Sequence, residues 1–343
     1  MFASVIVDIN NSEVDRIFQY SVVDKNVRVG DRVSVPFGNK LTQGIVIAVD
    51  DYCDLPEDKI KSVSEVIDPT PVLTEETLSL MDFITDNYYV TKAAALRLFL
   101  PSEMRKGKVK ESVVKFVCLK EGLDKDNFVL SLKKSAIKQV ACVDYLKENG
   151  KTKLSVLSEK FGASAVKSLA EKGVVCFTEE RIIRSPYKDL QSVKKQVVLT
   201  EKQENAAESI KNTDKTVSLL FGVTGSGKTE VYLKLIEDVL AQGKTAIMLV
   251  PEIALTPQMF KQLRGRFGGS AAILHSGLSA GEKFDEWWRL RTGEAKIAIG
   301  ARSAIFAPLE NVGLIVIDEE HDGSYSSESR PRYNTRCFFQ TSL

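Results

Sequence analysis

The chain has 343 residues, 43% of them hydrophobic, and a formal net charge of +1. This length indicates two or three domains, and the hydrophobic content is ordinary for globular cores. No run approaches about 18 apolar residues, which argues against a membrane-spanning helix, and the N-terminus lacks the basic region of a secretion signal. The five cysteines form no C-x-x-C pair, so we expect no zinc site, no disulfide framework and a cytoplasmic location.

The charge is unevenly distributed along the chain. Residues 1–104 hold 9 Lys/Arg against 17 Asp/Glu, residues 105–195 hold 21 against 11, and residues 196–343 hold 17 against 18. A basic segment inside a neutral chain is typical of nucleic-acid binding, although a Lys-rich solubilising surface gives the same count. We expect these three segments to be separate domains.

The first segment is predicted to be rich in β-strands. Apolar alternation predicts short strands at 4–9, 16–23, 27–36, 44–49 and 62–67, which suggests a small barrel or sandwich. A helix is expected to follow, because Thr74 and Thr77 with two intervening Glu residues form a capping-box pattern.

The basic middle segment is predicted to be helical and then to turn into strand. Helices are expected at 136–149, 154–161 and 164–172, each followed by a glycine, and a β-hairpin is expected from 174–177 and 181–184. Three helices and a hairpin are typical of a winged-helix domain, which binds either DNA or other proteins. Residues 185–195 are a predicted linker.

The third segment opens with the strongest motif in the chain. An apolar run at 217–221 leads into Gly222, from which the spacing is G-x-x-x-x-G-K-T, the P-loop pattern. Gly225 and Gly227 let backbone N–H groups curl around phosphate, Lys228 reaches the β- and γ-phosphates, and Thr229 can ligate Mg²⁺. We therefore predict a site for a nucleoside triphosphate made of Gly222, Thr224, Gly225, Ser226, Gly227, Lys228 and Thr229.

The rest of this segment predicts a parallel α/β lobe. Short runs of Val, Ile and Leu at 217–221, 245–250, 271–274, 297–299 and 314–317 suit strands buried on both faces, and helices are expected between them at 230–242 and 282–291. The strand at 314–317 ends at Asp318 and Glu319. We predict that Asp318 binds Mg²⁺ through water and that Glu319 deprotonates the hydrolytic water. Gln203, before the P-loop, offers the donor and acceptor that adenine requires.

Together these motifs resemble the first motor lobe of superfamily 2 helicases, a RecA-like fold. The segments GVTGSGKTE (222–230), VPEIALTPQ (250–258), LHSG (274–277), IGARSA (299–304) and DEEHD (318–322) occur in that family's order. The residues of these segments resemble those of the primosomal replication-restart helicases in particular. The N-terminal patterns R-x-F-x-Y (16–20), V-x-V-P-F-G (33–38) and K-I-K-S-V (59–63) are similar to that family's domain for binding the 3′ end of a nascent strand.

The resemblance implies further site residues. A 3′-end pocket would include Phe18, Gln19, Gly38 and Lys61, with Gln19 at a position where the family usually has Asp. The DNA strand would lie near Arg302, Ser303 and Tyr325. His321 and the loop containing Tyr325 would couple the nucleotide site to DNA, and Ser326 and Ser327 stand where the family often has Lys-Gln.

The implied function is an ATP-dependent 3′→5′ DNA helicase that recognises stalled forks and starts primosome assembly. Its ligands would be ATP, Mg²⁺ and branched DNA, and its partners the single-stranded-DNA-binding protein and primosome proteins. The second lobe and zinc-binding cysteines of the family are missing, so we expect a truncated chain with little ATP turnover. Two alternatives stay open: a non-motor DNA-binding scaffold, and another superfamily 2 translocase, against which the N-terminal VPFG segment argues.

Overall fold

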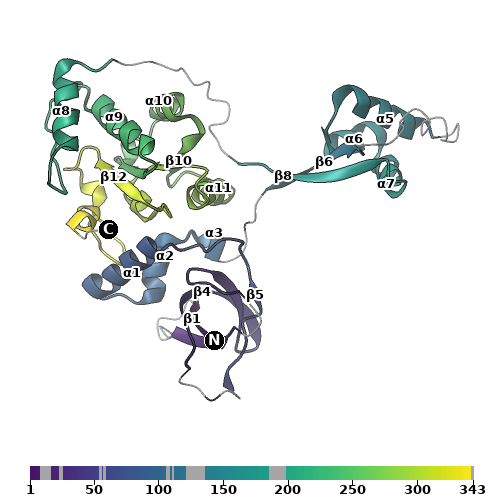
Figure 1. Ribbon diagram of the computed structural model, residues 1–343, viewed down its shortest axis with the longest axis horizontal. Helices are drawn as coiled ribbons and strands as arrows, with labels where there is room; N and C mark the ends of the chain where they lie inside the picture. The colour runs from purple at the N-terminus through teal and green to yellow at the C-terminus, as the bar shows by residue number, and fades with distance from the viewer. Residues whose placement is uncertain are drawn as a thin grey trace. The chain divides into compact units, whose positions relative to one another are not determined.

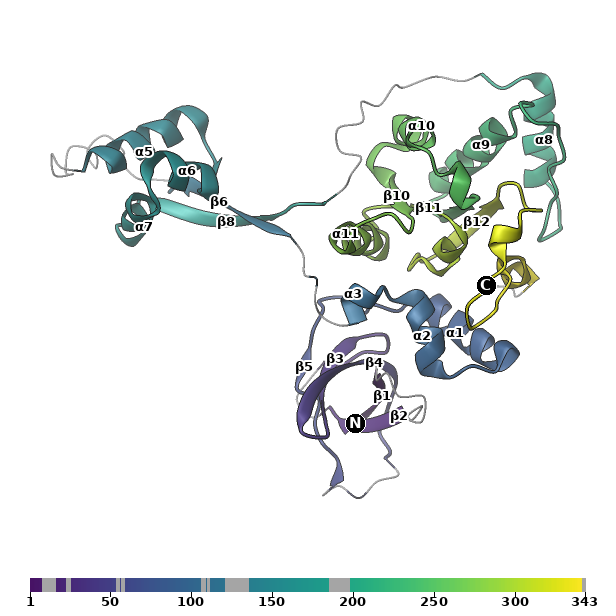
Figure 2. The same ribbon diagram turned by 180° about the vertical axis from the view of Figure 1, so that it is seen from behind.

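The computed structural model describes residues 1–7, 17–22, 26–53, 56, 59–105, 109, 112–120, 136–184 and 198–340. The chain divides into two compact units, one formed by residues 1–110 and 185–343 and the other by residues 111–184 (Figures 1 and 2). The predicted linker at 185–195 lies outside the described residues. Among the described residues, no helix is both long enough and apolar enough to cross a membrane.

The first unit begins with an antiparallel sheet of five strands in the order β2-β1-β4-β3-β5. The strands are β1 (Phe2–Val7), β2 (Ile17–Ser21), β3 (Arg32–Phe37), β4 (Lys40–Asp50) and β5 (Glu65–Val66). Residues 62–64 connect its ends, since Val63 N–H donates to Ser21 O at 2.9 Å and Ser64 N–H donates to Ser34 O at 2.8 Å. The sheet therefore curls around a core of small branched side chains that includes Val5, Val33 and Val46, as the alternating sequence predicts.

Three helices follow the sheet: α1 (Glu75–Tyr88), α2 (Lys92–Phe99) and α3 (Ser102–Arg105). The predicted capping box is confirmed, because Thr77 N–H donates to Thr74 Oγ1 at 3.1 Å and Thr74 N–H donates to Thr77 Oγ1 at 2.7 Å. Both bonds satisfy amides that the first helical turn leaves without partners. The sequence reading did not predict α2, whose short apolar run resembles a strand in length.

The rest of the first unit is an α/β lobe with a parallel sheet in the order β10-β11-β9-β12. The strands are β9 (Thr245–Leu249), β10 (Ala271–Leu274), β11 (Ile297–Gly300) and β12 (Val312–Ile317), close to their predicted positions. The helices are α8 (Glu201–Lys211), α9 (Lys228–Ala241), α10 (Pro257–Phe267) and α11 (Ala280–Arg291).

The lobe sheet is covered on both faces, as a parallel sheet requires. Helices α9 and α10 pack on one face through Leu233, Ile236 and Leu263 (Figure 2). The other face shares its core with α11 and the N-terminal helices. The indole N–H of Trp287 on α11 donates to Phe99 O at 3.0 Å, which joins segments 188 positions apart. This shared core fixes the N-terminal helices against the lobe.

The predicted strand at 217–221 is wrong. No strand is assigned there, and the side chains of Val217, Leu219 and Phe221 are 62%, 75% and 91% exposed. A strand needs a neighbour for its backbone N–H and C=O groups, and among the described strands β12 pairs with β9 alone. Only Leu220 packs on the core. The apolar composition of residues 217–221 therefore predicted a buried strand, whereas most of these side chains are exposed in the structure.

The described residues of the second unit, 112–120 and 136–184, form three helices and a three-stranded antiparallel sheet in the order β7-β6-β8. The helices α5 (Ile137–Asn149), α6 (Leu154–Phe161) and α7 (Ala163–Glu171) lie close to their predicted positions, and the strands are β6 (Val113–Leu119), β7 (Thr152–Lys153) and β8 (Val175–Arg181). The predicted hairpin is wrong, because β8 runs unbroken and pairs with β6. The residues between the two predicted arms, Thr-Glu-Glu, include no turn former.

Candidate functional site: a phosphate loop, an acidic turn and a cationic pocket

The loop at 222–227 has the backbone conformation that its glycines permit. Gly225 and Gly227 have positive φ angles of 78° and 82°, which other residues rarely adopt. A Cβ atom at Gly222 would lie 2.9 Å from Ser226 Oγ. Helix α9 begins at Lys228, directly after the loop, so its positive end faces the space that the loop encloses. This arrangement fits a bound phosphate.

Lys228 lies folded over this loop. Its ammonium group donates to Gly222 O at 2.7 Å and to Val223 O at 3.4 Å. These neutral carbonyls are weaker partners for an ammonium than a phosphate oxygen is, because charge-assisted bonds are stronger. Residues 223–226 are exposed, so an anion can reach the loop from solvent.

The structure brings Gln203 directly onto the loop. Its Nε2 donates to Ser226 O at 3.2 Å, and its Oε1 accepts from Thr200 N–H at 2.9 Å. The second bond belongs to the capping box that begins α8. The predicted adenine contact stays a prediction, and in this conformation both ends of the Gln203 amide hold protein groups instead.

Asp318 is held at the end of β12, opposite the start of α9. Its N–H donates to Leu249 O at 2.9 Å, which fixes it beside β9. Burial is the main cause that raises the pKa of its carboxyl group, and Glu319 raises it further, whereas Lys228 and a hydrogen bond from Tyr232 oppose the shift. Lys228 and Tyr232 are one helical turn apart on α9 and share a face. The structure thus brings the predicted Lys228 and Asp318 together.

Tyr232 is a member of this group that the sequence reading missed. Burial, and then the negative charge of Asp318, raise the pKa of its hydroxyl group to about 12. The phenol therefore stays protonated and can donate to the Asp318 carboxylate. Its position four residues after Lys228 is the one sequence signal that would have indicated it.

Glu319 has an unusual backbone conformation, with φ at +46°. Such left-handed angles are uncommon for residues other than glycine and cluster at functional turns. His321 Nδ1 lies 3.7 Å from Glu319 Oε2, and both side chains are largely exposed at 77% and 46%. The turn therefore presents a carboxylate and an imidazole to solvent beside the half-buried Asp318.

Tyr325 lies in the core rather than on a surface that DNA can contact. Its side chain is 0% exposed, and its hydroxyl group donates to the backbone carbonyl of Asp318 at 2.6 Å. Burial, and then the charge of Asp318, raise the pKa of this hydroxyl group, so it remains a donor. The predicted role of Tyr325 at the DNA stays a prediction, and in this conformation its side chain contacts protein groups. It instead connects the acidic turn with the loop that follows.

Arg302 reaches the same loop from the turn after β11. Its Nη1 donates to Ser324 O at 3.3 Å and also to Ser326 O, on the two sides of Tyr325. Its guanidinium carbon lies 5.7 Å from the ring centre of Tyr333. A continuous series of contacts therefore runs from Asp318 through Tyr325 and its neighbouring carbonyls to Arg302.

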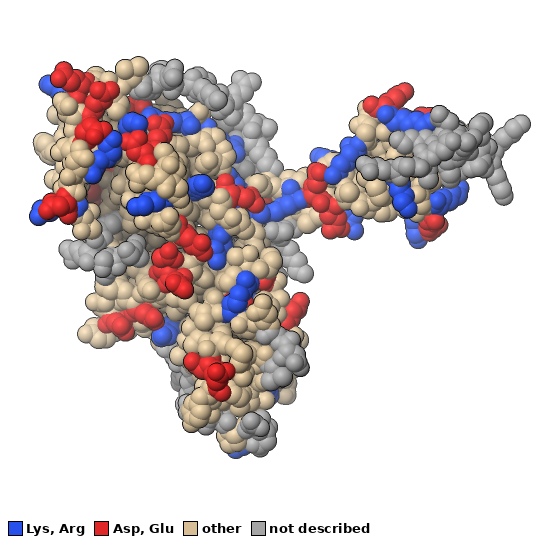
Figure 3. All heavy atoms as spheres, in the orientation of Figure 1, with Lys and Arg blue, Asp and Glu red and all other residues tan. Residues whose placement is uncertain are grey.

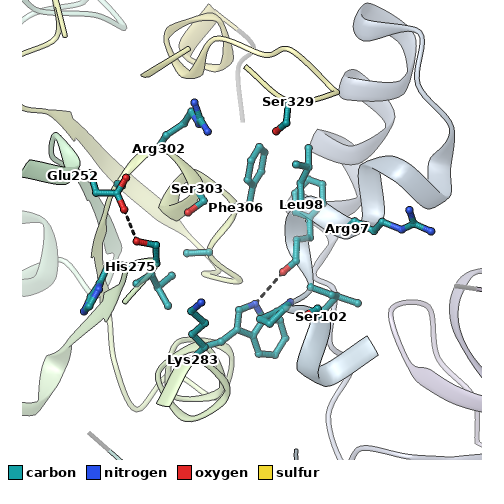
Figure 4. Close-up of a pocket in the computed structure, with 18 of the residues that line it drawn as sticks. Arg97, Leu98, Ser102, Glu252, His275, Lys283, Arg302, Ser303, Phe306 and Ser329 are labelled. Atoms are coloured by element: carbon teal, nitrogen blue, oxygen red, sulfur yellow. Dashed lines mark hydrogen bonds between the residues drawn. The ribbon is translucent and has the colours of Figure 1, made fainter. Parts of the chain in front are cut away.

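Arg302 also lines a pocket of about 880 Å³ between the lobe and the N-terminal helices. The lining includes Arg97 from α2, Lys283 from α11, and Arg302 with Ser303 from the lobe, and in Figure 4 the guanidinium group of Arg97 extends away from the centre of the pocket. Arg105 is a fourth cation in the lining, against the two carboxylates of Glu252 and Glu328. Glu252 accepts a hydrogen bond from Ser276. The pocket is therefore a cationic hollow suited to phosphate groups.

The pocket is a better indication of a nucleic-acid surface than overall charge is. On the face drawn in Figure 3, Lys and Arg are interspersed with Asp and Glu and form no continuous basic band. The side-chain ammonium group of Lys283 makes no hydrogen bond or ion pair with the described residues, whereas its backbone N–H donates to Ser279 O. Its long chain and charge are thus available for a phosphate. The sequence reading missed Lys283 and Arg97, because each is an ordinary helix residue until the fold places it here.

His275 in the pocket wall supplies a pH-dependent prediction. Its ring stacks on Phe260 at 5.7 Å, and burial, followed by the charge of Lys283, lowers its pKa, with Glu252 and Glu282 opposing. The unfolded chain therefore binds the proton more readily, and stability is expected to fall as pH decreases below about 6.5. Urea unfolding at about pH 7.5 and about pH 5.5 measures this difference. His275→Gln should reduce the difference in stability between the two pH values, and an unchanged difference in this variant would refute the prediction.

The four residues assigned to the 3′-end pocket fall into two groups. Phe18 packs edge-on against Phe37 at 5.0 Å, and Lys61 Nζ donates to Gly38 O at 3.3 Å, next to Phe37 in the chain. Gln19 points to the other face of β2, as strand alternation requires, and its Oε1 accepts from the Cys53 thiol at 3.0 Å. The structure therefore brings Phe18, Gly38 and Lys61 together and separates Gln19 from them.

Two family models match the chain. A 3′ DNA-binding domain matches residues 4–101, and a DEAD/DEAH box helicase matches residues 200–337. The first covers the curled sheet and α1–α2, and the second covers α8 to the segment after Tyr325.

No cluster of three or more His, Cys, Asp or Glu able to hold a metal occurs in the part of the chain that the structure describes.

Curated relatives agree with both matches. The replication restart protein PriA of Bacillus subtilis is 37% identical over 98% of this chain and 51% of its own length. PriA of Haemophilus influenzae is 34% identical over 94% of this chain and 45% of its own length. PriA of Treponema pallidum is 56% identical over 34% of this chain. The chain spans about half the length of the first two relatives.

Proposed function

Because the chain belongs to the PriA family of replication restart proteins, matching its N-terminal half, we propose that it is the fork-binding and nucleotide-binding part of an ATP-dependent 3′→5′ DNA helicase. One observation supports this most strongly. The P-loop Lys228 lies close enough to Asp318 on the same lobe for its charge to lower the pKa of that carboxyl group, and Tyr325 and Arg302 connect Asp318 to a cationic pocket.

ATP with Mg²⁺ is the proposed ligand of the loop. Gly222, Thr224, Gly225, Ser226 and Gly227 would surround the phosphates with backbone amides, and Lys228 would leave the Gly222 carbonyl to bind them. Thr229 and Asp318 would hold Mg²⁺, which neutralises charge developing on the phosphates when bound. Glu319 would position and deprotonate the water, and Gln203 would hold the shape of the loop through its bond to Ser226 O.

The contacts of Tyr325 suggest how the nucleotide site and the DNA site communicate. A movement of the Asp318 backbone would shift the Tyr325 hydroxyl group that donates to it. It would also shift the carbonyls of Ser324 and Ser326 on either side of Tyr325, which accept hydrogen bonds from Arg302. Arg302 and Ser303 line the pocket in which a strand of DNA would lie, so the path ends at the DNA. His321 would act beside it through Glu319. This is a short mechanical path between the two sites rather than a long-range one.

The N-terminal domain is proposed to bind the 3′ end of a nascent strand. Phe18 would stack on the terminal base, and Lys61 would contact a phosphate. We propose the domain division 1–104, 105–195 and 196–343, with the second unit as a winged-helix domain. Branched DNA, the single-stranded-DNA-binding protein and primosome proteins are the proposed partners, in the cytoplasm.

A second candidate is a DNA-binding scaffold whose P-loop is silent or regulatory. The exposure of residues 223–226 and of the 217–221 segment favours it, because phosphates bound there stay open to water on one side. We therefore expect weak nucleotide binding and little ATP turnover. A DNA-stimulated ATPase assay measures this, and a rate near the common enzyme value of about 10 s⁻¹ would contradict it.

Binding to DNA ends tests the proposal for the N-terminal domain. We expect the chain to bind a fork with a 3′-hydroxyl about 3- to 10-fold more tightly than one with a 3′-phosphate, the loss expected for one or two hydrogen bonds. Fluorescence anisotropy measures both affinities. Lys61→Ala should weaken both, whereas Lys92→Ala, which removes a charge paired with Asp82, should change neither. Equal affinity for the two forks would remove the end-binding assignment.

A further inference from the structure

Two cysteines far apart in the sequence meet in the second unit. Cys118 on β6 and Cys176 on β8 are direct partners in the antiparallel register. Their sulfur atoms lie 2.7 Å apart, across 58 positions of sequence. The sequence reading treated the cysteines as scattered, because register cannot be read from spacing alone. The fold thus places two thiols in contact.

The backbone spacing at this position falls within the range that a disulfide can span. Lys120 N–H donates to Val174 O at 2.9 Å, and Ile182 N–H donates to Ser112 O at 2.7 Å. Cys118 and Cys176 lie an even number of residues from both bonded pairs and so occupy a hydrogen-bonded position of the ladder. Cα atoms at such positions are about 5.5 Å apart, within the about 4.4–6.8 Å that disulfides span.

The two thiols are also accessible from solvent. Val117 and Val175, the neighbours of the cysteines, point into the core of the second unit. Since side chains alternate along a strand, Cys118 and Cys176 lie on the opposite face of the sheet, and both are half-buried. Cys142, in contrast, is fully buried in the core. A small oxidant can therefore reach the pair without unfolding the unit.

We propose that Cys118 and Cys176 are an oxidation site that forms an intramolecular disulfide on exposure to a peroxide. One thiol attacks hydrogen peroxide, which breaks the O–O bond and yields a sulfenic acid and water. The second thiol then attacks this sulfur, the S–S bond forms, and a second water leaves. Overall, two thiols are oxidised and one peroxide is reduced to two waters.

The bond would join the strands through which the chain enters and leaves the second unit. β6 begins at Val113 and β8 ends at Arg181, so the bond encloses the helices α5, α6 and α7 in one covalent ring. A ring of this size restricts the unfolded chain. Oxidation is therefore expected to make this unit more resistant to proteolysis and reduction to reverse the effect.

Peptide mapping of the folded full chain tests the proposal. The chain is treated with hydrogen peroxide, its remaining thiols are alkylated after denaturation, and it is digested with trypsin. The expected product is a single species linking peptides 116–120 and 173–181, absent after reduction, with Cys53, Cys142 and Cys337 alkylated. A chain in which Cys118 and Cys176 stay alkylated, or carry sulfinic acid instead, would overturn the proposal.

Variants separate this reaction from general oxidation. Cys118→Ser and Cys176→Ser should each abolish both the linked peptide and the oxidation-dependent protease resistance. Cys337→Ser, at an exposed cysteine outside the unit, should leave both unchanged. If the linked peptide formed equally well in denaturant, the fold would not be responsible, and the assignment would fail. The wild-type map decides the question even if a variant folds poorly.

Discussion

Replacing Lys228 by alanine is expected to weaken binding of ATP with Mg²⁺ by about 10- to 100-fold. A charged hydrogen bond contributes about 1.5–3 kcal/mol, and a tenfold change corresponds to about 1.4 kcal/mol. The loss falls on nucleotide rather than on folding, because the ammonium group of Lys228 contacts only carbonyls of its own loop in the described structure. Fluorescence titration with a labelled ATP analogue measures the affinity.

Lys234 offers a matched control on the same helix. Its ammonium group pairs with Asp238 at 2.7 Å, one turn and a half beyond Lys228 and away from the loop. Lys234→Ala removes the same charge and should leave nucleotide affinity within about twofold. The variant loses only an ion pair near the surface, and such pairs contribute about 0–1 kcal/mol to stability. If K228A and K234A bound nucleotide equally well, the loop would not be the nucleotide site.

Tyr325 is expected to give the largest effect on folding. Tyr325→Ala removes a fully buried aromatic side chain and should lower the free energy of unfolding by about 3–5 kcal/mol. Tyr325→Phe keeps the ring and removes only the bond to the Asp318 carbonyl. It should cost about 0.5–3 kcal/mol, the upper end applying if that carbonyl stays without a partner. Denaturant unfolding of the two variants measures both values.

The phenylalanine variant also tests the proposed coupling. Tyr325→Phe should leave DNA affinity in the absence of nucleotide nearly unchanged while reducing the effect of DNA on nucleotide affinity. Tyr20→Phe is the control, because Tyr20 is also buried and donates to a backbone carbonyl, that of Pro36 at 3.4 Å, in the N-terminal sheet. Equal coupling in Y325F and wild type would show that the contact with Asp318 is structural alone.

The sequence predicted those parts of the lobe whose signals are local. The strands near 245–250, 271–274, 297–299 and 314–317 follow from continuous runs of Val, Ile and Leu. The P-loop follows from its glycines, whose positive φ angles the structure contains. Such features depend on residues within one turn or one strand, so pattern alone is sufficient.

The errors arise where the outcome depends on a distant neighbour. The 217–221 run has the composition of a buried strand, yet it is exposed because no described strand lies beside it. Likewise β8 pairs with β6, some 60 positions earlier in the chain, rather than with its own continuation. Strand pairing is a property of the whole sheet, and local propensity does not determine it.

The pocket was hidden for the same reason. Arg97 belongs to the first of the two sequence segments that form the first unit, whereas Lys283 and Arg302 belong to the second segment, about 190 and 200 positions later. The sequence indicated Arg302 through its motif, whereas nothing local distinguishes Arg97 or Lys283 from solvated surface residues. Only the shared core between α11 and the N-terminal helices brings them to one hollow.

The central claim is that the proposed nucleotide loop of the lobe communicates with the cationic pocket between the lobe and the N-terminal helices, where we propose that DNA binds. Its most direct test is the affinity of the chain for a fluorescent ATP analogue with Mg²⁺, measured without DNA and with a saturating fork. Coupling energies of about 1–3 kcal/mol are typical between linked sites. We predict that the fork tightens nucleotide binding by about fivefold or more. Identical affinity in the two titrations would contradict the account and favour a scaffold with a silent P-loop.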